Sequence, residues 1–75
     1  MMKCFITTKG NLGNAEVPFE SEGEMGSDKL RRDALEAVRK HFHGAVLPEE
    51  RTEEAETAYW RNYYGYRLDS YIHKA

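Results

Sequence analysis

The sequence predicts a single α+β domain over residues 1–75, in which one main amphipathic helix packs on one face of a small antiparallel sheet. Two short N-terminal segments alternate apolar and polar residues, as half-buried strands do. The next segment repeats its apolar residues at helical spacing instead. A chain of 75 residues buries one thin core, which fits one domain and leaves little room for a deep substrate pocket.

The first strand is expected at residues 2–8, with Cys4 and Ile6 on one face and Phe5 on the other. Residues 9–14 contain two glycines and two asparagines, which favour a turn because both residue types tolerate a positive φ. The chain is therefore expected to reverse there and to continue as an antiparallel partner strand.

This partner strand is expected at residues 15–21, where Ala15, Val17 and Phe19 fall on one face. Pro18 lies on the opposite face and has no N–H to donate to a neighbouring strand. The strand should therefore lie at an edge of the sheet, with Pro18 towards the open side.

The main helix is expected at residues 28–43, because its apolar residues recur every four positions and form one stripe. The stripe consists of Leu30, Ala34, Val38 and Phe42. A short polar side chain, from Ser27 or Asp28, is available to cap the first turn. Gly44 stands where a left-handed residue would end the helix.

Residues 53–64 admit two interpretations. Thr52 as an N-cap, acidic residues in the first turn and Gly65 as a terminator predict a second short helix. The tyrosines and the tryptophan of residues 57–64 favour a strand, since aromatic residues suit a pleated surface. The start and stop signals slightly favour the helix.

Two further strands are expected in the second half of the chain. The apolar residues 45–47 read as a short strand that returns to the sheet and ends at Pro48. Residues 66–73 alternate sufficiently to form the final strand.

Composition narrows the classes of protein to consider. The longest apolar run falls far short of the roughly 20 residues that span a bilayer. The lone cysteine, Cys4, cannot form an internal disulfide, and residues 1–3 lead directly into a strand rather than a signal peptide. We therefore expect a cytoplasmic protein. The net charge of -2 argues mildly against an obligate nucleic-acid binder.

Reactive side chains are few and scattered. The soft metal ligands are Cys4, His41, His43 and His73, and the two neighbouring histidines point roughly 200° apart on a helix. Cys4 has no nearby base in the sequence that would activate it as a nucleophile. We expect no metal, no cofactor and no enzymatic activity.

The most unusual feature is a concentration of aromatic residues between positions 59 and 71. It holds all five tyrosines and the only tryptophan of the chain, interleaved with Arg61 and Arg67. About half of these rings should belong to the core, and the remainder should be exposed. Exposed tyrosine and arginine side chains anchor protein interfaces and also stack on single-stranded bases.

These patterns select ten candidate partner-binding residues, which come from the helix surface, the acidic run and the aromatic segment. They are Arg32, Arg39, Lys40, Glu50, Glu53, Glu54, Arg61, Tyr63, Tyr64 and Arg67. The acidic residues are read first as a solvated face and second as a surface that competes for a basic groove.

Residues 2–47 resemble several small phage-encoded inhibitors of type I CRISPR-Cas surveillance complexes, the anti-CRISPR proteins. The resemblance consists of two N-terminal strands followed by an amphipathic helix that ends in Phe42-His43-Gly44-Ala45-Val46. It implies a protein of a phage or mobile element that binds a Cas subunit and blocks DNA recognition. Residues from Pro48 onward have no counterpart in this pattern, so no site residue is carried over from it.

Two functions are therefore expected in order of preference. The first is a non-enzymatic inhibitor that acts by occupying the surface of a partner protein. The second is a small nucleic-acid-binding module that stacks Tyr and Trp rings on bases and contacts phosphates through arginine. The exposed aromatic residues also leave self-association open.

Overall fold

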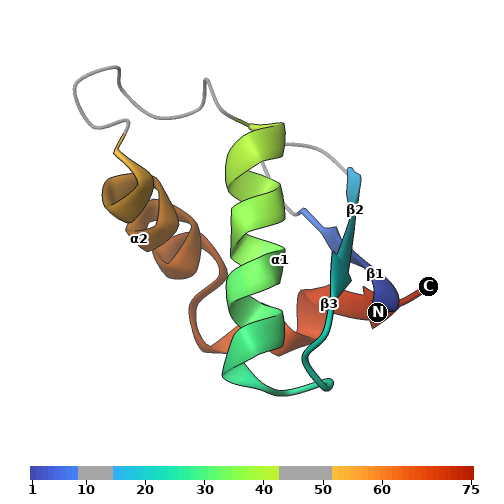
Figure 1. Cartoon of the computed structure of the whole chain (residues 1–75). Coiled ribbons are helices and arrows are strands. Elements are labelled where there is room, and N and C mark those ends of the chain that lie inside the picture. Colours follow the sequence, from blue (N-terminus) through green and yellow to red (C-terminus); the bar gives the residue numbers. More distant parts are fainter. Residues whose placement is uncertain (9–14, 43–51) are drawn as a thin grey trace.

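The computed structural model describes residues 1–8, 15–42 and 52–75, and it confirms the small α+β fold. The elements in chain order are β1 (Met2–Thr7), β2 (Glu16–Ser21), α1 (Asp28–His41), α2 (Glu53–Tyr64), the 3₁₀ helix η3 (Gly65–Tyr71) and β3 (Ile72–Lys74). Figure 1 shows α1 between the sheet on one side and α2 on the other. The helix α1 therefore contributes to both halves of the core.

The sheet is antiparallel and has the strand order β2-β1-β3. Ile6 of the central strand pairs with Val17 of β2 and with Ile72 of β3, and all three side chains are buried. The predicted alternation in β1 is confirmed, because Cys4 and Ile6 are buried while Phe5 stacks on His73 with ring centroids 5.0 Å apart. The strand β2 lies at an edge, as Pro18 requires.

The helix α1 begins where the sequence predicts. The hydroxyl of Ser27 accepts a hydrogen bond from the N–H of Leu30 at 3.2 Å and so caps the first turn. Leu30, Ala34 and Val38 of the predicted stripe are buried, and Leu35 joins them. The last helical residue is His41 rather than residue 43, and Phe42 forms the C-cap. The proposed terminator, residue 44, lies outside the described residues.

Residues 53–64 form a helix, as the capping signals indicated. The hydroxyl of Thr52 accepts from the N–H of Ala55 at 3.1 Å, and Gly65 has a φ of 61° at the other end. The helix buries Glu56, Trp60 and Tyr64, a stripe spaced every four residues. A helix can therefore place the largest rings in the core, so the aromatic composition of this segment does not require a strand.

The prediction of a strand over residues 66–73 is wrong for most of its length. Residues 65–71 form η3, and only the last part of the segment continues as β3. Alternating apolar residues do not distinguish a strand from an irregular turn that buries one residue, here Leu68. Asp69 reaches Arg31 of α1, and this tertiary contact holds the segment in its 3₁₀ conformation.

Two other predictions, the turn at residues 9–14 and the strand at residues 45–47, lie outside the described residues. None of the helices in the described ranges has the length and apolar character needed to cross a membrane.

Candidate interaction surface

Four of the candidate residues meet where α1 and α2 lie side by side. One hollow in this boundary is lined by residues of both helices: Lys29, Arg32, Asp33, Glu36 and Arg39 of α1, and Glu53 and Thr57 of α2. The helices α1 and α2 contact each other along this boundary. Residues far apart in the sequence, such as Arg32 and Glu53, therefore share one surface.

A second hollow continues the first towards η3. Its lining comes from α1, α2 and η3 and consists of Asp28, Arg31, Arg32, Leu35, Arg61 and Leu68. Arg32 lines both hollows, so together they form one surface feature, which we call the interhelical groove. Three predicted arginines, Arg32, Arg39 and Arg61, thus lie along a single groove.

The charged neighbours of these three arginines are mostly paired within the chain. Arg31 contacts Asp69 through Nε at 2.8 Å and through Nη2 at 2.9 Å, and it contacts Asp28 through Nη1 at 2.7 Å. The hydrogen bonds from Arg31 lower the pKa of the Asp69 carboxyl, and in return they raise the pKa of the guanidinium. Lys40 contacts Glu36 at 2.9 Å.

The side chains of Arg32, Arg39 and Arg61 form no ion pair and no hydrogen bond with any of the described residues. Arg32 and Arg61 are exposed, while Arg39 is half-buried. The Nε atom of Arg39 is buried without an acceptor among the residues that the structure describes. An unsatisfied buried donor is uncommon in a folded protein and marks a place where water, an ion or a partner group is expected.

The acidic candidates divide into two groups. Glu53 and Glu54 are exposed in the first turn of α2, where their charge complements the positive end of the helix dipole. Glu56, a third acidic residue in this turn, is by contrast only 2% exposed. Its spacing of four from Trp60 is the signal that could have identified this position as buried. Glu50 lies outside the described residues.

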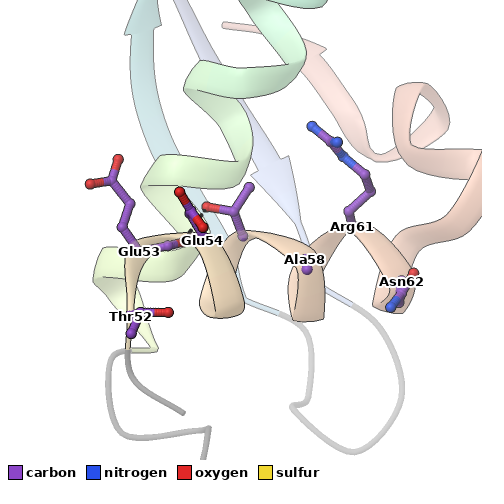
Figure 2. Close-up of a pocket in the computed structure, with 7 residues that line it drawn as sticks. Thr52, Glu53, Glu54, Ala58, Arg61 and Asn62 are labelled. Carbon is purple, nitrogen blue, oxygen red and sulfur yellow. Dashed lines mark hydrogen bonds between the residues drawn. The ribbon is translucent and has the colours of Figure 1, made fainter.

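A shallow hollow also lies along α2 itself. Figure 2 shows the side chains of Glu53, Glu54 and Arg61 extending from the same side of this helix. Every residue that lines the hollow belongs to α2 or is its cap, Thr52. One helix cannot enclose a ligand on several sides, so this hollow is an open surface rather than a cavity.

Some rings of the aromatic segment are buried and others are exposed, as predicted, but the exposed rings are not the ones selected from the sequence. Tyr64 is 2% exposed, and its hydroxyl donates to the carbonyl oxygen of Thr7 at 2.9 Å. Burial raises the pKa of this phenol. Tyr64 is therefore part of the core, and its selection as a partner-binding residue was wrong. Tyr63 is half-buried, with its ring 5.2 Å from that of Trp60.

The exposed rings are Tyr59 and Tyr66, with 44% and 92% of their surface accessible. Neither was selected from the sequence. The guanidinium carbon of Arg67, which was selected, lies 5.7 Å from the centroid of the Tyr66 ring, within range of a cation–π contact. The exposure of Tyr66 could have been inferred from its position directly after Gly65, because a residue that ends a helix turns the next side chain away from the buried stripe of that helix.

Within the described ranges, no three His, Cys, Asp or Glu side chains come together in a way that could hold a metal ion. Comparisons with protein-family models, curated proteins and solved structures found no match to this chain.

Proposed function

We propose that the chain is a non-enzymatic binding protein that acts by covering part of the surface of another protein. The observation that carries this proposal is the row of arginines in the interhelical groove, Arg32, Arg39 and Arg61, which form no ion pair with the described residues. Arginine is enriched at protein interfaces, where its planar group binds carboxylates through two hydrogen bonds. The neighbouring side chains of Arg31 and Lys40 form ion pairs with acidic residues of the chain, so these three arginines differ from their neighbours.

The shape of the surface supports binding by contact rather than by enclosure. The interhelical groove is lined by side chains of two helices and η3, and the hollow of Figure 2 is lined by α2 and its cap alone. Open hollows of this kind suit a protein surface that is covered over a broad area. The exposed rings of Tyr59 and Tyr66 add two residues of the type that anchors interfaces.

The first partner to test is a type I CRISPR-Cas surveillance complex, because residues 2–47 resemble inhibitors of these complexes. In this form of the proposal the chain binds a Cas subunit and prevents DNA recognition by steric occupancy. Purified type I complexes would be incubated with the tagged chain and assayed for co-purification and for binding of target DNA. We expect stoichiometric capture and loss of DNA binding. Unimpaired DNA binding by every complex, with no Cas subunit captured, would contradict this form.

A second candidate function is the binding of single-stranded nucleic acid. The Tyr66–Arg67 pair favours it, because an exposed ring beside a guanidinium can stack on a base. This function predicts a mobility shift of short single-stranded DNA or RNA that weakens as salt is raised. No shift at low salt would exclude it.

A further inference from the structure

The part of the interhelical groove next to η3 has an apolar floor and a basic rim. The floor is the accessible part of Leu68, which is 7% exposed, and the fully buried Leu35 lies beneath it. The rim includes Arg32 from α1 and Arg61 from α2, which face the same hollow from two different helices. We call this feature the arginine hollow. It combines cationic donors and apolar surface within the span of a few side chains.

A third arginine, Arg31, holds the wall of the arginine hollow in place. Its guanidinium is bound by both oxygens of Asp69 and by Asp28, so it joins η3 to the start of α1. Arg31 is therefore engaged in the fold, while Arg32 and Arg61 donate no hydrogen bond to any residue that the structure describes. Two guanidinium groups with free donors beside one hollow are suited to hold a carboxylate by bidentate hydrogen bonds.

The charges around the hollow favour an isolated carboxylate over a nucleic-acid backbone. Asp28 and Asp69 lie at the same end of the groove, and Glu53 lies farther along it. A polyphosphate strand carries closely spaced negative charges and would meet these carboxylates as well as the arginines. A single carboxylate next to an apolar side chain would instead meet Arg32 and Arg61 while its neighbour covers the exposed part of Leu68.

We infer that the arginine hollow is the docking site for an acidic segment of the partner protein, in which an aspartate or glutamate adjoins an apolar residue. This inference rests on the proposed function, since it specifies the chemistry of the partner at one place on the binding surface. The carboxylate is bound by Arg32 and Arg61, and the apolar neighbour contacts the leucine floor.

The test uses the full chain labelled with ¹⁵N and a synthetic peptide of alternating glutamate and leucine, acetylated and amidated at its ends. The Nε–H resonances of the arginines are followed as the peptide is added. We expect saturable shifts for Arg32 and Arg61 and none for Arg67, which lies outside the hollow. The same peptide with glutamine in place of glutamate should bind roughly tenfold more weakly, because it lacks the charge.

The matched variants are Arg32→Gln, Arg61→Gln and the control Arg67→Gln. Each of the first two should weaken binding of the glutamate peptide roughly tenfold, and the control should leave it unchanged. Because neither Arg32 nor Arg61 is paired in the fold, both variants should keep the circular dichroism spectrum and the melting temperature of the parent chain.

Four results would overturn the inference. Equal binding of the glutamine peptide would show that charge is not recognised. If inorganic phosphate shifts the same resonances at the same concentration as the glutamate peptide, the hollow is a general anion site. If a single-stranded oligonucleotide binds there more tightly than the glutamate peptide, the hollow is a nucleic-acid site. If a captured partner binds the Arg32→Gln and Arg61→Gln variants as tightly as the parent chain, this inference fails while the proposed function stands. If no partner is found, the proposed function fails even where the peptide binds.

Discussion

The two sides of α1 use their polar side chains in different ways. On the side of the sheet, Asp33 accepts hydrogen bonds from the hydroxyl of Ser21 at 2.6 Å and from the ammonium of Lys29 at 3.1 Å. The Ser21 hydroxyl also accepts from the N–H of Gly23 at 2.9 Å, which ties the end of β2 to the helix. On the side of α2, Arg32 and Arg39 form no ion pair with another described residue, although the charge of Arg32 still acts on Asp33.

This difference separates charges that stabilise the fold from charges that are free to bind a partner. The helix α2 contacts α1 through the buried ring of Trp60, which lies 5.5 Å from the ring of Phe42, the C-cap of α1. Ring packing buries apolar area without requiring partners for the charges at the edge of the contact. An exposed arginine such as Arg32 can therefore lie at this boundary without an ion pair to another described residue.

The largest effect is expected for Trp60→Ala, because this side chain is fully buried between the two helices. The substitution should lower the free energy of unfolding by about 3–5 kcal/mol and loosen α2 from α1. Urea denaturation and near-ultraviolet circular dichroism would measure the change. Tyr59→Ala removes the exposed neighbouring ring and serves as the control. Equal losses in the two variants would contradict attachment of α2 by Trp60.

A smaller effect is expected for Asp33→Asn, which weakens the contact of α1 with β2. Partial burial alone would raise the pKa of this carboxyl, but its bonds to Ser21 and Lys29, together with the charges of Lys29 and Arg32, outweigh the effect of burial and hold the pKa below its usual value. The free energy of unfolding should fall by about 1–2 kcal/mol at neutral pH, where the charged form is present.

The sign of the pH dependence follows from this lowered pKa. The stabilisation by Asp33 is fully present above the usual carboxyl pKa of about 4 and is lost as the pH falls through the lower pKa of the folded chain. Urea titrations from neutral to acidic pH should therefore show parent and Asp33→Asn curves that converge in acid. A constant gap down to the lowest pH at which both fold would contradict this role of Asp33.

A loss of about 1 kcal/mol is expected for Tyr64→Phe, since the variant keeps the ring but removes the donor to the Thr7 carbonyl. This bond joins α2 to β1 across the core, so the change isolates one polar link from the ring packing. Thermal melting would measure the loss. Tyr66→Phe changes an exposed hydroxyl and should leave the melting temperature unaltered; an equal decrease there would rule out a specific role for the Tyr64 bond.

The smallest effect on stability is expected for Arg32→Gln and Arg61→Gln, at most about 0.5 kcal/mol each. Neither side chain is paired in the fold, in contrast to Asp33 on the other side of α1. Urea denaturation at neutral pH would measure both variants beside Asp33→Asn. A loss as large as that of Asp33→Asn would mean that these arginines serve the fold, and the contrast between the two sides of α1 would no longer hold.

Local signals in the sequence were sufficient for the helices and for the first two strands. Ser27 and Thr52 have the short polar side chains that cap helices, and both do so through the N–H three residues on. The alternation around Cys4 and Ile6 likewise selected the face of β1 that meets the core. Such signals act within a few residues, so they can be read without knowing the rest of the fold.

The sequence by itself determined the α+β class, the helix positions and the arginines of the candidate surface. Tertiary structure alone decided that Tyr64 and Glu56 are buried, that residues 65–71 form a 3₁₀ helix, and that Arg31 forms ion pairs while its neighbour Arg32 forms none with the described residues. The physical reason is that each of these outcomes depends on a group distant in the chain, as with Arg31 and Asp69. Local spacing specifies which face a residue occupies, but only packing specifies what that face meets.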